Sequence, residues 1–469
     1  MRRLFTQSIF LLILCFIFFT ACKKEVFTND SNAMITKSTD SVKFDTVFTS
    51  VGSVTQYFKI RNNNNLAIRI SSIKLMGGAT SAFKLNIDGV SNSEVRDLEL
   101  PANDSIYVFV SLTINPNSNS LPFIVSDSIL ISWNGNNQFV QLEGYGQNAH
   151  FMNNQTIHND TAWNNDLPYV IVGQLKIDSA STLSLLPGCK IFAHANSKIL
   201  VNGTLLVNGE KNKEVVFTGD RLDEYYKDIP GSWPGLYFNT SSKKNILKYA
   251  IIKNAIRGIE VNNPSETADP KLTIHQTTID NAFEYGIFAH NSSIDIDNSI
   301  ISNCENNIQI EFGGVYNFTN CTAVGYSTKF ISHDKPVLQT NNFYDESGTI
   351  FKNDLTATFK NCIFWGSGGL NENEILFQKE EGTVYQVTLE NCLYKINQEP
   401  SFINFLSCIN NQMPAFDSVD VYNNYFDFRT TKDDTSPNIN TGTITNFSKD
   451  LDDKIRMIGI TDIGCYEKQ

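Results

Sequence analysis

The residues best suited to chemistry lie in two places, an acidic pair and an aromatic insertion. In the pair, Asp295 and Asp297 are separated by one apolar residue, Ile296. On a strand the two carboxylates would share one face, and because Ile296 should face inward, we expect both to point outward. Such a pair could bind a cation or serve as acid and base on a glycosidic bond. The alternative is two solvated acids on an outer sheet.

The insertion, residues 219–234, interrupts a stretch of sequence that otherwise predicts β-strands. Its candidate ligand-binding side chains are Arg221, Asp223, Glu224, Tyr225, Tyr226 and Trp233. Flat rings beside charged groups are what carbohydrate sites use for stacking and for hydrogen bonds to hydroxyls. The alternative is a local hydrophobic plug, in which the three rings fold back and Arg221 pairs with Asp223.

Other patterns of catalysis or metal binding are absent from the sequence. The six histidines show no metal-ligand spacing, and there is no nucleophile elbow, P-loop or dinucleotide fingerprint. We therefore expect no catalytic residue that can be named, no metal site and no cofactor; calcium would be needed only by a polysaccharide lyase. A formal net charge of −12 argues against a nucleic-acid partner.

The N-terminus has the features of an exported protein. Two arginines precede an apolar run at residues 9–19, which is shorter than the roughly 20 residues of a membrane-spanning helix. The motif Phe19-Thr20-Ala21-Cys22 resembles the bacterial lipobox, although the family most often has Leu where Phe19 stands. This resemblance implies that Cys22 is acylated; an ordinary secretory signal is the alternative.

These features predict a location in the cell envelope. We expect residues 1–21 to be a lipoprotein signal peptide and residues 22–42 a polar tether. The lipid on Cys22 would make the membrane a partner of the protein, anchoring it in the outer membrane with its domains facing the surface.

The composition predicts an all-β chain rich in turns. Its 54 asparagines outnumber its 37 lysines and arginines, and Asn favours turns over helix interiors. Residues 43–148 read as short alternating strands separated by turn signals. Their order resembles the immunoglobulin-like β-sandwich modules of bacterial envelope proteins, which usually serve as spacers; independent binding by this module is the alternative.

Residues 149–432 contain a repeated phrase of an apolar residue, any residue, an amide, a small residue, any residue and an apolar residue. Its small position falls at residues 250, 277, 299, 321, 362, 392 and 424. A period near 22 residues with insertions is typical of a stacked β-solenoid. The step of 41 fits either two coils or one coil with a long loop.

Stacking would align equivalent residues in columns about 4.8 Å apart per coil. We expect the amides to form a hydrogen-bonded ladder. The small column, which includes Cys321, Cys362 and Cys392, should lie in the core as reduced thiols; a disulfide between neighbours in this column is the alternative.

Two further segments carry a family resemblance. Residues 173–188 and 200–220 resemble the opening coils of right-handed parallel β-helix proteins, and residues 436–467 resemble the ending of bacterial surface β-helix proteins. The implied fold class is all-β, with an immunoglobulin-like β-sandwich followed by a right-handed parallel β-helix. Residues 433–469 would be a C-terminal tail that packs on or caps the β-helix.

Three functions remain open because this fold hosts lyases, hydrolases, epimerases and binders. The absence of a catalytic cluster favours a non-catalytic lipoprotein that contacts polysaccharide or an envelope protein through the β-helix. A polysaccharide lyase or glycoside hydrolase acting in a groove of the β-helix is the second. A purely structural envelope component is the third.

Overall fold

The computed structural model describes residues 26–49, 52–115, 123–456 and 459–468. Cys22 and the predicted signal peptide lie outside these residues. The chain divides into two compact units, Met1–Asn148 and Ala149–Gln469. The described residues are almost entirely strands and turns, with one short 3-10 helix at Gly78–Thr80. None of their helices has the length and apolarity needed to cross a membrane.

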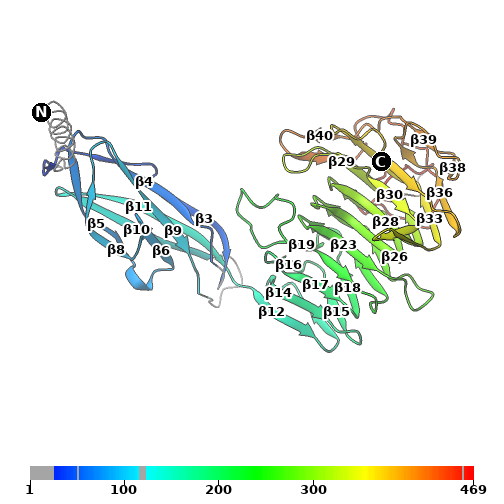
Figure 1. Cartoon of the computed structure of the whole chain (residues 1–469), viewed down its shortest axis with the longest axis horizontal. Coiled ribbons are helices and arrows are strands. Elements are labelled where there is room, and N and C mark those ends of the chain that lie inside the picture. The colour runs from blue at the N-terminus through cyan, green and yellow to red at the C-terminus, as the bar shows by residue number, and fades with distance from the viewer. Residues whose placement is uncertain (1–25, 50–51, 116–122, 457–458, 469) are drawn as a thin grey trace, which may run out of the picture. The chain divides into compact units, whose positions relative to one another are not determined.

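The first unit is a β-sandwich of two sheets (Figure 1). The six-stranded sheet has the order β1-β5-β10-β11-β3, with β8 also paired to β5, and the five-stranded sheet has the order β2-β4-β9-β6-β7. The strands are β1 (Phe27–Thr28), β2 (Ile35–Lys37), β3 (Ser41–Phe48), β4 (Gln56–Asn62), β5 (Ala67–Leu75), β6 (Phe83–Ile87), β7 (Val90–Ser91), β8 (Glu94–Leu100), β9 (Ser105–Leu112), β10 (Phe123–Trp133) and β11 (Asn136–Gln147). Burial alternates along them, so that β9 buries Ile106, Val108 and Val110 between the sheets.

The sandwich begins earlier than the sequence predicted. β1 pairs in parallel with β5, and β2 pairs antiparallel with β4. Ala33 and Ile35 are buried in the core, and Ala33 O accepts a hydrogen bond from the Trp133 indole at 2.8 Å. The tether expected over residues 22–42 is therefore wrong from Phe27 onward. The segment is mostly polar, so the sequence analysis predicted a tether and missed the few apolar residues, such as Ala33 and Ile35, that pack into the sandwich core.

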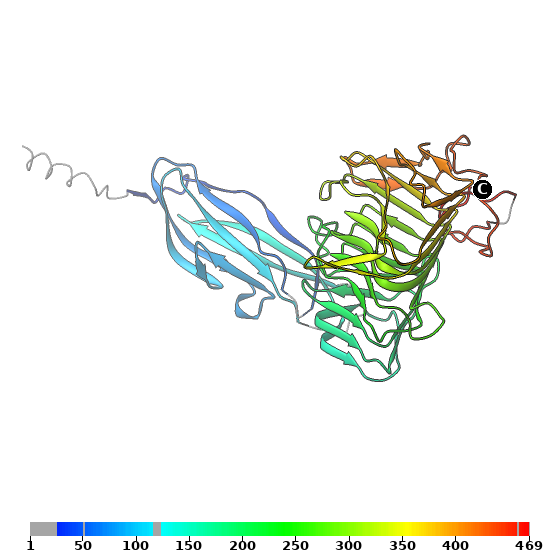
Figure 2. The same ribbon diagram turned by 45° about the vertical axis from the view of Figure 1, so that its right-hand side comes forward.

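The second unit is a parallel β-helix, in which 26 strands pair into one sheet system (Figures 1 and 2). Equivalent strands of successive coils stack on one another and form three parallel sheets, which we call A, B and C. Sheet A contains β16 (Lys190–Ala193), β19 (Val215–Gly219), β22 (Ala250–Lys253), β25 (Thr278–Asp280), β27 (Ile300–Ser302), β29 (Thr322–Tyr326), β34 (Ile363–Ser367), β37 (Leu393–Tyr394) and β39 (Ile409–Asn410). Sheet B contains β17 (Lys198–Val201), β20 (Leu236–Phe238), β23 (Arg257–Asn262), β30 (Leu338–Asn341) and β35 (Ile375–Gln378).

Sheet C contains β13 (Thr161–Trp163), β15 (Thr182–Leu185), β18 (Thr204–Asn208), β21 (Asn245–Lys248), β24 (Leu272–His275), β33 (Leu355–Lys360), β36 (Tyr385–Glu390) and β38 (Asn404–Leu406). Four longer strands bend between sheets. β12 (His150–Ile157) and β14 (Tyr169–Ile177) run from sheet A into sheet B, and β26 (Tyr285–Asp297) and β28 (Asn306–Thr319) run from sheet B into sheet C. The inward apolar residues of all three sheets form one continuous core from Ile157 to Ile403.

The bend from sheet C to sheet A contains the amide ladder. Asn361 Nδ2 donates to Asn320 Oδ1 at 2.9 Å, and Asn320 Nδ2 donates to Asn298 Oδ1 at 3.5 Å. Asn298, Asn320, Asn361 and Asn391 all have φ between 44° and 53°, the left-handed region that Asn tolerates better than most residues. The adjacent Cys321, Cys362 and Cys392 are buried free thiols.

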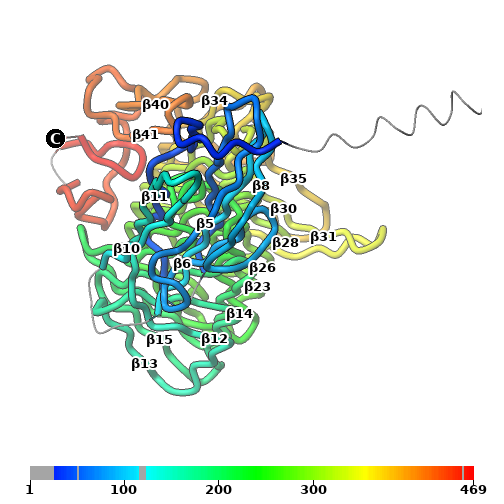
Figure 3. The backbone as a smooth tube through the Cα atoms, turned by 90° about the vertical axis from the view of Figure 1, so that its left-hand side faces the viewer, coloured from blue at the N-terminus to red at the C-terminus, as the bar shows by residue number. Residues whose placement is uncertain are grey.

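The step of 41 residues is a single coil with an insertion. β33 stacks directly on β28 and β34 directly on β29. The additional residues include the antiparallel hairpin of β31 (Phe343–Glu346) and β32 (Thr349–Lys352), which projects from the stack (Figure 3).

The last predicted repeat, at residues 421–426, is not a coil. β40 (Ser418–Asp420) and β41 (Tyr425–Asp427) form an antiparallel hairpin, and its turn contains Asn423 and Asn424. The stacked strands end at β39, earlier than the predicted boundary at residue 432. Asn favours a hairpin turn for the same reason that it favours a solenoid bend, so the sequence pattern could not separate the two.

The C-terminal tail runs beside the coils along the amide ladder. Thr443 N donates to Asn361 Oδ1 at 2.9 Å, and Arg456 Nε donates to Asn298 Oδ1 at 2.7 Å. Arg456 is completely buried and also reaches Glu467 Oε2 at 3.1 Å. The tail therefore fastens several coils together.

Candidate functional site

A polar cleft of about 330 Å³ lies over the outer face of sheet A. Its floor comes from three neighbouring strands, β22, β25 and β27, and its walls from the insertion, the β40–β41 hairpin and the tail. The lining residues that matter chemically are Asp228, Lys253, Thr278, Asp280, Ser302, Asn303, Tyr425, Asp427, Arg429 and Tyr466. Segments distant in sequence thus meet over one sheet.

The position of the cleft follows from the pattern on sheet A. Toward the C-terminus its outward residues become apolar, as at Val324, Ile363 and Leu393. The hairpin and the tail cover these residues with Phe428 and Ile463, among others, and form a separate core. The cleft lies over the part of sheet A that the hairpin and the tail do not cover, where the outward side chains of the sheet are mostly polar.

Asp280 lies on the floor of the cleft. Ser302 Oγ donates to Asp280 Oδ1 at 2.6 Å. Burial raises the pKa of Asp280, and the nearby charge of Asp228 raises it further, while Ser302 and Lys253 oppose the shift. Asp280 therefore holds a proton more readily than an exposed aspartate.

A second column of asparagines supports one wall. Asn254 Nδ2 donates to Lys227 O at 2.6 Å, and Asn281 Nδ2 donates to Asp228 O at 2.8 Å. These bonds hold the insertion against the bend from sheet A to sheet B. The next member, Asn303, is 4% exposed, and its Oδ1 has no hydrogen-bond partner within the described residues. Such a group is costly unless something polar meets it.

The charged groups of the cleft differ in how they are engaged. Arg429 binds Asp427 Oδ1 at 2.9 Å and Asp452 Oδ2 at 2.6 Å, and its guanidinium lies 4.8 Å from the Tyr466 ring. It therefore anchors the hairpin to the tail. Lys253 has no ion pair at 4.0 Å or less with any described residue. The Tyr425 ring, 60% exposed, stands at the rim.

The structure of the insertion has features of both predictions, the ligand-binding loop and the local hydrophobic plug. Trp233 is 1% exposed and donates from its indole to Lys253 O at 2.9 Å, which corrects its assignment as a ligand contact. Arg221 Nε binds Asp223 Oδ1 at 2.9 Å, and its guanidinium lies 3.8 Å from the Tyr226 ring. Tyr225 is 69% exposed and meets Tyr226 edge to face. Trp233 and the Arg221–Asp223 pair thus behave as a plug.

The remaining candidates of the insertion stay outside the cleft. Glu224 pairs with Lys227 at 2.8 Å on the exposed side of the loop. Neither it nor the two tyrosines line the cleft, which the insertion reaches through Asp228 instead.

The pair at 295 and 297 is not a joint site. Both acids flank the inward Ile296 as expected, but Asp297 is only 5% exposed because neighbouring side chains cover it. It is hydrogen-bonded to His275 in the preceding coil, and its Oδ1 accepts from Asn298 Nδ2 at 2.9 Å. Asp295 Oδ1 accepts from Asn317 Nδ2 at 2.8 Å in the following coil. Each carboxylate serves a separate contact between coils.

The cleft residues carried a weak signal in the sequence. Asp280 and Ser302 close equivalent strands 22 residues apart, directly after an inward Ile. That periodicity places them on one outer face, but one of the walls comes from the β40–β41 hairpin, which the sequence pattern predicted to be a coil. Within the described ranges, no three His, Cys, Asp or Glu side chains are grouped so that they could hold a metal ion.

Comparisons by sequence found no match. No protein-family model matches the chain, and no curated protein matches it.

Comparison with solved structures gives distant likenesses. The thermostable GH87 α-1,3-glucanase catalytic unit from Streptomyces thermodiastaticus strain HF3-3 aligns over 79% of this chain and 91% of its own, at 7% identity and a TM-score of 0.20. A family 123 glycoside hydrolase from Clostridium perfringens, at 10% identity, and the Vibrio cholerae VesB protease, at 12%, each align over 25% of this chain with TM-scores of 0.18. The aligned parts span only 26% and 32% of those two proteins. The parallel β-helix is therefore assigned from the strand pairing itself.

Proposed function

We propose that this protein is a lipid-anchored lipoprotein of the cell envelope that binds glycan, without changing it chemically, in the cleft over sheet A. Its anchor would be the lipid on Cys22, which would hold it in the outer membrane facing the surface. The observation that carries the binding proposal is Asn303 Oδ1, which is buried in the polar lining of the cleft with no hydrogen-bond partner among the described residues, together with Lys253 and Asp280 in the same lining.

The lining suits a sugar better than an apolar ligand. A sugar offers hydroxyls on its edge and C–H groups on its faces. The carboxylate of Asp228, the ammonium of Lys253 and the hydroxyl of Thr278 can hydrogen-bond the edge, while the exposed Tyr425 ring can stack on a face. The volume of about 330 Å³ lies at the lower end of the range for small-ligand sites, roughly 300–1,000 Å³.

A glycan array with the full-length protein and two variants tests this function. Lys253→Gln removes a charge from the floor and should weaken binding at least tenfold, since a hydrogen bond to a charged group contributes about 1.5–3 kcal/mol. Lys243→Gln, in the exposed connection between β20 and β21 of the same unit, should bind as the parent does. Absence of glycan binding by the parent, or equal affinity of both variants, would leave the envelope-protein partner or the structural role as the better account.

One observation favours catalysis as the second candidate. A carboxyl with a raised pKa facing another carboxylate is how glycosidases separate their acid from their base, and Asp280 and Asp228 line one cleft. Glycans bound on the array should then be incubated with the protein and assayed for new reducing ends. Release that Asp280→Asn abolishes, with binding retained, would establish a hydrolase; a lyase would instead produce unsaturated ends and could require calcium.

A further inference from the structure

The five-stranded sheet of the sandwich exposes three aromatic rings on its outer face. Tyr57 on β4 and Tyr107 and Phe109 on β9 are 56%, 39% and 38% exposed. Tyr57 lies directly opposite Phe109 in the strand register. The ring centroids are 5.5 Å apart for Tyr57 and Tyr107, 6.0 Å for Tyr57 and Phe109, and 5.9 Å for Tyr107 and Phe109. The three rings thus form one contiguous group, the aromatic platform.

The charge of this sheet is opposite to that of the chain. The outward side chains of its strands include Lys59, Arg61 and Lys84, and none of the five strands contains an acidic residue, although the whole chain has a net charge of −12. Lys59 Nζ lies 4.7 Å from the centroid of the Tyr107 ring, and hydrogen bonding with the Tyr107 side chain raises the pKa of Lys59. A cation at the platform therefore stays charged at neutral pH.

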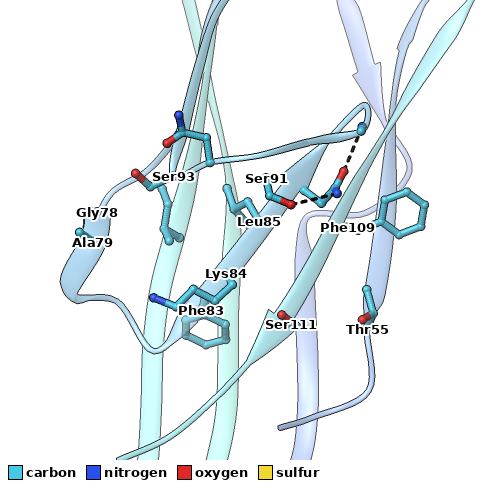
Figure 4. A pocket seen from close by; sticks show the side chains of 14 residues that line it. Thr55, Gly78, Ala79, Phe83, Lys84, Leu85, Ser91, Ser93, Phe109 and Ser111 are labelled. Atoms are coloured by element: carbon cyan, nitrogen blue, oxygen red, sulfur yellow. Dashed lines mark hydrogen bonds between the residues drawn. The ribbon is translucent and has the colours of Figure 1, made fainter.

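A pocket of about 760 Å³ continues from the platform along the edge of the same sheet (Figure 4). Phe109 belongs to both features, and Leu85 contributes apolar surface to the pocket. The other side of the pocket is polar, with Lys84 and Asn86 on β6. Asn86 Nδ2 donates to Ser91 Oγ at 3.2 Å, and Asn86 Oδ1 accepts from Gly89 N at 2.9 Å, so this amide is held in place.

We propose that the platform and its pocket form a second binding site, for an acidic polysaccharide. The rings present flat apolar surface that C–H faces of sugars can cover. Lys59, Lys84 and Arg61 can pair with the carboxylates or sulfates of an acidic glycan, which a neutral glycan lacks. The charge complementarity selects this occupant, because a basic face on an acidic protein attracts anionic chains locally. The site lies within the first unit and is independent of the cleft over sheet A.

Binding of the full-length protein to polygalacturonate and to neutral dextran, measured by affinity electrophoresis, tests the proposal. The parent should be retarded by polygalacturonate and not by dextran, and salt should weaken the retardation. The double variant Tyr57→Ala/Tyr107→Ala and the single variant Lys59→Gln should each lose at least tenfold in affinity. Because all three side chains face outward, melting temperatures should stay close to that of the parent.

Matched controls lie on the opposite sheet. Tyr145→Ala on β11 and Lys43→Gln on β3 remove exposed residues of the same types and should bind polygalacturonate as the parent does. Lys243→Gln, at an exposed lysine of the second unit outside the cleft, should also leave this binding unchanged. Equal loss in test and control variants, equal retardation by dextran, or displacement of polygalacturonate by anionic phospholipid vesicles that bind more tightly would overturn the proposal.

Discussion

Replacing Asn361 by alanine tests the amide ladder at its most connected rung. The side chain is completely buried. Its Nδ2 donates to Asn320 Oδ1 at 2.9 Å and to Thr443 O at 2.7 Å, and its Oδ1 accepts from Thr443 N at 2.9 Å. The residue also has φ of 52°. Alanine would remove all three hydrogen bonds and leave the unfavourable backbone conformation.

The expected cost follows from these contacts. Three hydrogen bonds at about 1 kcal/mol each contribute about 3 kcal/mol, and a left-handed alanine adds about 1 kcal/mol. The total, about 4 kcal/mol, should lower the melting temperature by about 8 °C, at about 2 °C per kcal/mol for a unit of this size. Asn361→Gly avoids the backbone strain and should cost about 1 kcal/mol less than Asn361→Ala.

Circular dichroism melting of the parent and variants measures this difference. Asn212→Ala is the matched control, because Asn212 is exposed with φ of 64° and no side-chain hydrogen bond is recorded for it in the described structure. It should cost only the backbone term of about 1 kcal/mol. If Asn361→Ala melts within 2 °C of Asn212→Ala, the ladder does not stabilise the fold and the reasoning is wrong.

Three further predictions concern the anchor, the core and the tail. Cys22→Ala should abolish palmitate labelling and move the protein out of the membrane fraction; a variant that survives detergent-free washing on the membrane would contradict lipidation. Cys362→Arg should cost several kcal/mol because it buries an unpaired charge, whereas Lys360→Gln loses only a partly exposed pair with Glu390 and should cost about 0.5 kcal/mol in chemical denaturation; equal costs would refute the inward assignment. Burial raises the pKa of Glu467 from 4.5 to about 7, so its proton stabilises the folded state below pH 4.5 and this contribution, up to about 3 kcal/mol, is lost as the pH rises through 7. Melting at pH 5 and pH 8 should show that decline in the parent and not in Glu467→Gln.

The fold class was predictable because its determinants are local and periodic. The recurrent amide and small residues predicted a sharp bend in each coil. The structure places Asn320 and Cys321 at the bend from sheet C to sheet A, as this pattern predicted. Relationships of the first unit to immunoglobulin-like modules, and of the chain to lipoproteins, stay predictions.

The site was less predictable because its walls depend on contacts between distant segments. The repeat could place Asp280 and Ser302 on one face, but only tertiary packing brings Arg429 and Tyr466 over that face. Trp233 shows the opposite error: composition suggested a ligand contact, but its ring packs into the core between coils. An aromatic residue in an insertion can serve either purpose, and the sequence pattern does not reveal which one.

The most direct test of the central claim is a crystal structure of the full-length protein with the strongest glycan from the array. The account predicts sugar density in the cleft over sheet A, with the ring against Tyr425 and hydroxyls within hydrogen-bond distance of Lys253 and Asp280. Density for that glycan elsewhere on the β-helix, with the cleft filled only by water, would contradict it.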